Sequence, residues 1–367
     1  MILYRNYVYK PPFYSTKIRI DCQVRSSDLW IVLRADLFFD TMDFAFIHPE
    51  TRDSEKSLPM KIKKRTQSNL LLLLTAFIWG SAFVAQKVGG ALGPFTYNGI
   101  RTLLGGLVLI PVVLLTQRAD SGWQNATPEE RKAQWKIVLT AGILCGLMHF
   151  IASSLQQIGI AYTTASKAGF ITSLYAIIVP IISVFIGKRI RPIVWISCVI
   201  SVTGLYLISM KGGSFTLQFG DLLILLCAVF FALQILIIDH YSPKCSGVKM
   251  SCVQFLVSGT LGVICMFIFE TPHPAIIMHY WFSIIYGGVF STGIAYTLQI
   301  IGQKNTPATE ASLILCLEAV FSALTSTLFL HELLSVREYI GCALIFSAVI
   351  LSQLPEKQPA GAIFRKK

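Results

Sequence analysis

Ionisable side chains are rare in the long apolar stretches of this chain, and Glu318 lies near the centre of one of them. Such a side chain is costly in hydrocarbon, so one that is retained faces the interior of a helix bundle or a wet cavity. A carboxyl group there can exchange a proton, contact a polar group of a ligand, or form a hydrogen bond between helices while neutral. Glu318 therefore predicts either a working site or a buried helix contact, and both interpretations stay open.

Arg101 and His149 raise the same question in two other apolar stretches. Arg101 lies one turn into its stretch, where it either anchors the helix at the interface or contacts a substrate or counter-ion. His149 lies mid-stretch, as a packed and hydrogen-bonded side chain or as a ligand-binding one. The nine cysteines include no CxxC pair, and no cluster has metal-ligand spacing, so neither a metal nor another cofactor is expected.

Other candidates come from a repeat within the chain. At an offset of 143 residues, LQQIGIAYTTASKAGFITSLYA (155–176) aligns without gaps on LQIIGQKNTPATEASLILCLEA (298–319). Gln156 then pairs with Gln299 and Tyr175 with Glu318, while Trp79-Gly80 is echoed by Phe231-Ala232. We expect one cavity lined by aromatic, amide, phenol and carboxyl groups, although simple packing also explains an aromatic side chain. The candidate lining residues are Trp79, Asn98, Arg101, His149, Gln156, Tyr175, Phe231, Gln234, Gln299 and Glu318.

The elements that must position these residues are ten apolar stretches of roughly 20 residues, long enough to cross a bilayer as helices. Hydrophobic residues make up 54% of the chain and charged residues 14%, and the mean hydropathy is +0.64. With five stretches in each half, the two halves cross in opposite directions. The prediction is an all-α integral membrane protein with ten transmembrane helices in two inverted five-helix repeats. We expect the helices at 68–88, 95–115, 135–157, 168–186, 193–210, 218–240, 249–269, 277–301, 309–330 and 336–354.

The domain organisation follows, with a first repeat at 60–212, a second at 213–354 and a basic tail at 355–367. Residues 1–59 differ in character, since they have scattered aromatic and charged residues and no sustained period. They are either an extension upstream of a true start at Met60 or a disordered cytoplasmic tail. We expect them to make few contacts with the bundle.

The net charge of +12 indicates orientation. With the N-terminus inside, most Lys and Arg fall on the cytoplasmic side, and the other side holds only Lys87, Lys167, Lys211 and Arg337. Both termini are therefore expected in the cytoplasm, with basic residues touching membrane lipid. Nucleic-acid binding is not favoured, because the sequence has no basic surface with aromatic residues interspersed. We expect a multi-pass protein of the plasma membrane, in a bacterium the cytoplasmic membrane.

Several motifs resemble the EamA type of the drug/metabolite transporter superfamily. They are Trp79-Gly80-Ser81, Gly93-Pro94-Phe95, Asn98-Gly99-Ile100-Arg101, the segment 155–190, and TPATEASLILCLEAVFSALTSTLFLHELLSVREYIG (306–341). The resemblance covers residues 61–354 and implies a metabolite transporter. Two positions depart from the family pattern, which has Glu-Pro in the ninth span and Gly-Glu at its end. This chain has Glu318-Ala319 and His331-Glu332, and loss of the proline predicts a stiffer ninth helix, since a proline inside a helix frees a backbone carbonyl and introduces a kink.

Three function classes remain. A secondary transporter that moves a small metabolite such as an amino acid or its derivative, by export and alternating access, is favoured by the inverted repeat. A polytopic membrane enzyme would need clustered acid–base or metal residues at a membrane face, and the sequence has none. A receptor or scaffold would ordinarily carry a sizeable soluble domain. The sequence lacks the G-x-x-x-x-G-K-[ST] motif that would indicate an ATP-driven pump. The expected energy source is therefore a gradient, such as one of protons. The sequence leaves the oligomeric state open.

Overall fold

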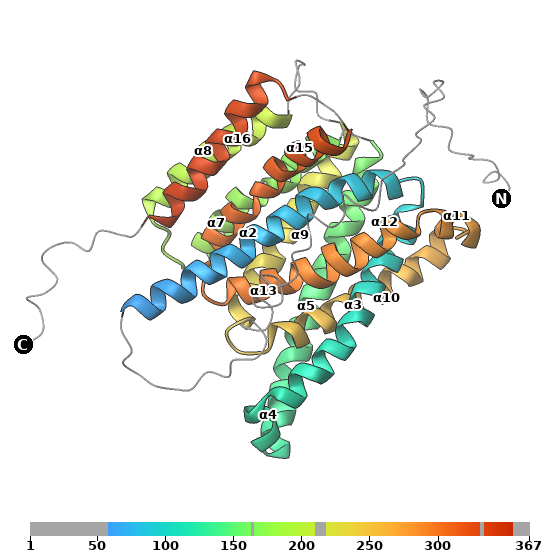
Figure 1. Ribbon diagram of the computed structural model, residues 1–367, viewed down its shortest axis with the longest axis vertical. Coiled ribbons are helices and arrows are strands. Elements are labelled where there is room, and N and C mark those ends of the chain that lie inside the picture. The colour runs from blue at the N-terminus through green and yellow to red at the C-terminus, as the bar shows by residue number, and fades with distance from the viewer. Residues whose placement is uncertain (1–57, 163–164, 210–217, 331–333, 355–367) are drawn as a thin grey trace, which may run out of the picture. The chain divides into compact units, whose positions relative to one another are not determined.

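The structure is a computed structural model that describes residues 58–162, 165–209, 218–330 and 334–354. Residues 1–57 and 355–367, with the expected N-terminal extension and basic tail, lie outside the described residues. All regular structure in the described part is helical (Figure 1). The longer helices are α2 (Leu58–Gly89), α3 (Pro94–Ala119), α5 (Pro128–Ile160), α8 (Pro192–Ser209), α9 (Phe219–Tyr241), α10 (Gly247–Phe269), α15 (Leu317–Leu330) and α16 (Val336–Gln353). The shorter ones are α4 (Ser121–Asn125), α6 (Ala165–Ser173), α7 (Tyr175–Phe185), α11 (Pro274–His279), α12 (Trp281–Ile285), the π-helix η2 (Tyr286–Ala295), α13 (Tyr296–Gln303) and α14 (Ala308–Leu315).

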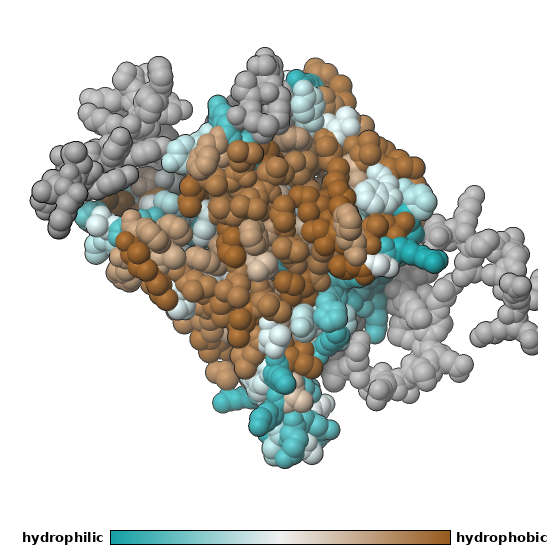
Figure 2. All heavy atoms as spheres, turned by 180° about the vertical axis from the view of Figure 1, so that it is seen from behind, coloured by the Kyte–Doolittle hydropathy of each residue, from teal (hydrophilic) through white to brown (hydrophobic). Residues whose placement is uncertain are grey.

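Eight segments of the described residues are helical, long and apolar enough to cross a membrane. They coincide with eight of the ten expected spans. The other two expected spans fall in α2 and in α8, whose apolar part, Pro192–Ile208, is shorter. Figure 2 shows a broad apolar surface on one face of the bundle, with hydrophilic side chains gathered at its margins.

Local sequence explains where several helices begin. Thr127 and Glu130 form a reciprocal capping box at the start of α5, and Ser335 and Glu338 do the same for α16. Helix α3 is capped from another helix, because Glu270, just after α10, accepts hydrogen bonds from the backbone N–H groups of its first turn, at 2.9 and 2.7 Å. This end of the bundle is called the Glu270 end below.

Two of the expected spans are interrupted near their middles. Helices α6 and α7 meet at Leu174, and α14 and α15 meet at Cys316. The chain forms a turn at Cys316 although no proline follows Glu318, and the stiffer ninth helix expected from Ala319 stays a prediction. The eighth span is irregular too, because its centre is the π-helix η2, which contains three glycines.

Glycines set how closely the helices pack. A Cβ atom at Gly204 in α8 would lie 2.7 Å from the backbone oxygen of Gly341 in α16, and one at Gly341 would lie 2.6 Å from the oxygen of Gly204. Figure 1 shows α8 and α16 side by side at one edge of the bundle. Gly142 and Gly146 of α5 both face α10, where the small residues let the two helices approach closely.

Candidate functional site

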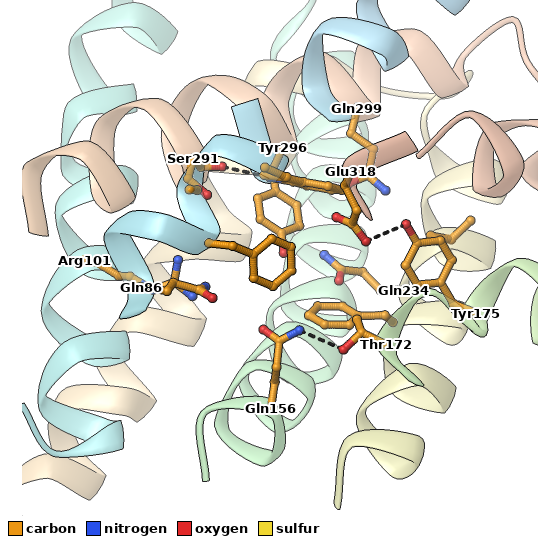
Figure 3. A pocket seen from close by; sticks show the side chains of 15 residues that line it. Gln86, Arg101, Gln156, Thr172, Tyr175, Gln234, Ser291, Tyr296, Gln299 and Glu318 are labelled. Carbon is orange, nitrogen blue, oxygen red and sulfur yellow. Dashed lines mark hydrogen bonds between the residues drawn. The ribbon is translucent and has the colours of Figure 1, made fainter. Parts of the chain in front are cut away.

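A pocket with about 570 Å³ of space between its walls, including space open to solvent, lies among helices of both halves of the chain (Figure 3). Helix α2 contributes Trp79 and Gln86, and α3 contributes Arg101. The remaining polar and aromatic walls come from α5, α6, α7, α9, η2, α13 and α15. The lining residues are Trp79, Ala82, Phe83, Gln86, Arg101, Gln156, Thr172, Tyr175, Phe231, Gln234, Ile235, Ser291, Tyr296, Gln299 and Glu318.

Eight of the ten residues predicted from the sequence line this pocket; Asn98 and His149 lie behind its wall. Asn98 accepts a hydrogen bond from Arg101 Nε at 2.9 Å and donates one to the backbone oxygen of Ser153 at 2.8 Å. His149 Nδ1 lies 2.9 Å from Ser258 Oγ, and its ring packs edge-on against Tyr296. Asn98 thus positions Arg101, and His149 supports the aromatic wall.

Glu318 is the acidic side chain of the pocket. It is 6% exposed, and its Oε1 accepts hydrogen bonds from Tyr175 Oη at 2.9 Å and from Ser173 Oγ at 3.4 Å. No ion pair to Glu318 occurs among the described residues. A carboxyl group held by neutral donors in a mostly apolar wall can be protonated without breaking a salt bridge.

Arg101 is the basic side chain of the pocket and is 5% exposed. Its guanidinium lies over the ring of Tyr97, at 5.3 Å from the centroid, and its described polar partner is the neutral amide of Asn98. The positive charge is therefore held in place without an acidic partner among the described residues. An anionic group of a ligand would supply one.

The amide groups around the pocket are incompletely paired. Gln156 donates to Thr172 Oγ1 at 3.1 Å. The Oε1 atoms of Gln86 and Gln299 and the Nε2 atom of Gln234 are buried and have no hydrogen-bond partner among the described residues. Buried amide atoms of this kind gain most from a polar ligand or from water.

Several residues that line the pocket were not predicted from the sequence. Gln86 and Tyr296 are polar side chains within expected spans, so the same criterion could have found them. Thr172 was hidden among other small residues of 155–176. Ser291 offered no signal, because its contribution includes the backbone oxygen that accepts a hydrogen bond from Trp79 Nε1 at 3.1 Å.

The end of the bundle opposite the Glu270 end holds two ion pairs to one carboxylate. Glu310, at the start of α14, pairs with Arg65 of α2 and with Arg191, which precedes α8, the latter at 2.6 Å. Arg191 also donates to the backbone oxygens of Ser352 and Leu354. This end is called the Glu310 end below. On α2 the pocket residues run from Trp79 to Gln86, so the pocket lies toward the Glu270 end.

A second set of contacts holds the start of α14. Asp239, at the end of α9, accepts a hydrogen bond from the backbone N–H of Ala308 at 2.9 Å and pairs with Lys188. The start of α14 is thus held by α2, α9 and the segment before α8 together.

The chain is similar in sequence and in fold to known proteins. The EamA-like transporter family matches residues 66–210 and 218–354, one match in each half. An uncharacterised transporter of Archaeoglobus fulgidus is 32% identical over 297 residues, which cover 79% of this chain and 87% of the relative. A WAT1-related chloroplastic protein of Arabidopsis thaliana is 24% identical and covers 78% of this chain and 69% of its own. A solved crystal structure with 20% sequence identity covers 78% of this chain and 96% of its own with a TM-score of 0.65, which is a likeness of fold.

Proposed function

The chain belongs to the EamA-like transporter family, and we propose that it is a secondary carrier that exports a small metabolite by alternating access. It is a multi-pass membrane protein related to transporters. The observation that carries the proposal is the pocket between the two halves. Glu318 and Arg101 both line this pocket. Carriers built from repeats bind their substrate at such an interface.

We also propose that the bundle consists of ten spans in two inverted repeats. Two equivalent close contacts between helices, one at each end of the bundle, support this proposal. A Cβ atom at Gly159 would meet the backbone oxygen of Gly220 at 2.9 Å, and one at Gly302 would meet the backbone oxygen of Ser68 at 2.9 Å. Gly159 and Gly302 are aligned by the 143-residue offset. Helix α2 also begins at the Glu310 end, whereas α9 begins at the Glu270 end.

The chemistry of the pocket favours an amphipathic substrate with both charges, such as an amino acid or its derivative. The carboxyl group of Glu318 suits an ammonium group, and the guanidinium of Arg101 suits a carboxylate. Trp79, Phe231 and Tyr296 supply aromatic surface for an apolar side chain. The unpaired amide atoms described above can satisfy the remaining polar atoms of such a molecule.

Proton coupling through Glu318 is part of the proposal. An ionised carboxylate in the middle of a membrane costs about 2.5–3.5 kcal/mol on insertion scales, so Glu318 is expected to be neutral when dry and to ionise when the cavity is wet. A group whose protonation depends on the access state can exchange a proton for substrate. The Glu310 end is proposed to face the cytoplasm of a bacterial cell, because Arg65 and Arg191 follow the positive-inside rule there.

Proteoliposomes provide the test. Purified full-length protein is reconstituted, and counterflow and pH-gradient-driven uptake are measured against a panel of amino acids, with empty liposomes as the control. The expected result is counterflow of at least one amino acid and faster transport when a pH gradient is imposed. No counterflow across the panel would contradict the substrate class, and uptake that does not respond to the imposed pH gradient would contradict proton coupling. The direction of net flux under a gradient tests export.

A further inference from the structure

Gln254 of α10 is buried completely, and neither atom of its amide has a hydrogen-bond partner among the described residues. An unpaired amide costs free energy in a helix bundle, where an apolar side chain of similar size would pack without that cost. The pocket described above does not include Gln254. The chain therefore keeps an unsatisfied polar group outside its known cavity, and the packing of the structure gives no reason for it.

The contacts between α3 and α10 show which residue of α3 is equivalent to Gln254 of α10. A Cβ atom at Gly106 in α3 would lie 2.9 Å from the backbone nitrogen of Leu256, and one at Gly259 in α10 would lie 2.4 Å from the backbone nitrogen of Leu103. In each helix a leucine precedes the glycine by three residues. The glycine of each helix contacts the leucine of the other helix, so the two contacts are equivalent. Gly106 is equivalent to Gly259, and Leu103 to Leu256. Two residues before these leucines stand Arg101 and Gln254.

A second pair of contacts supports the same equivalence. A Cβ atom at Gly288, in the irregular eighth span, would lie 2.8 Å from the backbone oxygen of Arg101. One at Gly146, in α5, would lie 2.7 Å from the backbone oxygen of Gln254. Helix α5 and the eighth span are themselves related by the repeat that aligns Gln156 with Gln299. Arg101 and Gln254 therefore occupy corresponding positions, each packed against a glycine of the corresponding neighbouring helix.

We propose that Gln254 is the counterpart of Arg101 in the transport path, and that it contacts the substrate when the pocket opens at the Glu310 end. This inference rests on the proposed carrier function. In the present structure the pocket lies toward the Glu270 end and contains Arg101, while α5 packs closely on α10 and covers Gln254. An exchange of conformations between inverted repeats would uncover Gln254 and cover Arg101. The unpaired amide would then find partners in water or substrate.

The exchange of a guanidinium for an amide has a consequence for binding. A carboxylate of the substrate would meet a full positive charge at Arg101 and only a neutral amide donor at Gln254. Hydrogen bonds from charged donors are roughly twice as strong as those between neutral groups. The substrate is therefore held less tightly by this position in the state that opens at the Glu310 end. Gln254 is a specificity-determining position as well as a lining one.

Site-resolved thiol labelling tests this without knowledge of the substrate. Full-length Gln254→Cys and Arg101→Cys are made in the natural background and exposed to a membrane-impermeant methanethiosulfonate reagent in vesicles of both orientations. Native Cys252 is the internal control, because it lies on the same helix, closer to the Glu310 end, and contacts Gly106. General loosening of that end would label Cys252 at least as fast as position 254.

The expected result is that Gln254→Cys is labelled from the Glu310 face at least tenfold faster than Cys252, and that Arg101→Cys is labelled from the opposite face. If Arg101→Cys is labelled and Gln254→Cys reacts no faster than Cys252, this inference is wrong while the proposed pocket survives. If neither engineered cysteine is labelled from either face, the carrier proposal fails and this inference fails with it.

A second variant covers the case in which Gln254→Cys does not fold. Gln254→Leu removes the unpaired amide and keeps the volume, so its Tm in detergent is expected to equal or exceed that of the parent. In that background Arg101→Cys should be labelled faster from the opposite face, because the state that hydrates position 254 is disfavoured. A fall in Tm of more than about 5 °C would show that the amide is structural and would overturn the inference.

Discussion

Tyr175 donates a hydrogen bond to Glu318 at 2.9 Å, and the two residues are separated by the 143 positions that relate the two halves of the chain. Equivalent positions of the repeat therefore contact each other directly. Ser173 and Cys316, also 143 apart, do the same, since Cys316 Sγ donates to the backbone oxygen of Ser173 at 3.5 Å. Both contacts lie where the two interrupted helices cross. A phenol faces a carboxyl group at this crossing, so the acidic group is unique to one half.

Replacement of Glu318 by glutamine tests the proposed proton coupling. Gln keeps the size of the side chain and its ability to accept the hydrogen bond from Tyr175, but it cannot titrate. We expect normal expression, loss of pH-gradient-driven transport, and counterflow that is at least partly retained. The measurement is transport in proteoliposomes with and without the gradient. Glu129→Gln, at an exposed carboxyl group of α5, is the matched control and should behave like the parent.

Two outcomes would return Glu318 to a structural role. One is an unchanged pH dependence of transport in Glu318→Gln, which would mean that another group carries the proton. The other is loss of folded protein, which would mean that the carboxyl group chiefly holds the helices together. Glu129→Gln distinguishes the second outcome from a general effect of removing a negative charge.

A pair of glycine variants tests the packing of α8 on α16. Gly204→Ala places a methyl group 2.7 Å from the backbone oxygen of Gly341, so the helices must separate, and we expect a loss of about 1–3 kcal/mol in unfolding free energy. Gly169→Ala is the matched control, because its methyl group would meet nothing within 4 Å and alanine is the better helix former by about 1 kcal/mol. Thermal unfolding in detergent should therefore shift in opposite directions. Equal shifts would contradict the close approach.

Sequence alone predicted the equivalence of Tyr175 and Glu318 but not their contact. The repeat aligns residues, whereas contact requires that the axis relating the halves pass between them, and that depends on how the helices pack. Gln156 and Gln299 were likewise matched by the repeat, and the structure brings both to one pocket. Polar side chains within apolar stretches are recognisable because burial in a membrane restricts where they can face.

Other features left no trace in the sequence. The backbone oxygen of Ser291 is available to Trp79 in the π-helical part of the chain, and no residue type encodes a carbonyl group. The ion pairs of Glu310 join helices far apart along the chain, so spacing cannot reveal them. The break between α14 and α15 at Cys316 has no proline beside it, so the residue types of the ninth span did not indicate it.

Cys245, in the loop between α9 and α10, is a chemical probe of the Glu310 end. Burial raises the pKa of its thiol to about 11, and Lys304 only partly opposes this. The thiolate is the reactive form, so maleimide labelling should be slow at pH 7 and rise about tenfold per pH unit up to that pKa. Lys244→Cys, at the exposed neighbouring position, should label fast at pH 7. Equal rates at the two positions would contradict the burial of Cys245.

The ion pairs at Glu310 predict a loss of stability when they are removed. Glu310 is 6% exposed at its side chain, so Glu310→Gln leaves Arg65 and Arg191 without their acidic partner in a partly buried site. Arg65 is 39% exposed and reaches solvent, which limits the effect, and we expect a decrease of about 2 kcal/mol in unfolding free energy. Chemical denaturation in detergent measures it.

Lys188→Gln is the matched control for that experiment, because its pair with Asp239 is more exposed, at 45% for the lysine side chain, and should cost less than about 1 kcal/mol. Arg191→Gln combined with Glu310→Gln completes a double-mutant cycle and isolates the energy of that pair. If these pairs also hold the Glu310 end shut, labelling of Gln254→Cys from that face should rise in the Glu310→Gln background. A loss of stability without such a rise would make the pairs a structural contact and would place the gate elsewhere in the bundle.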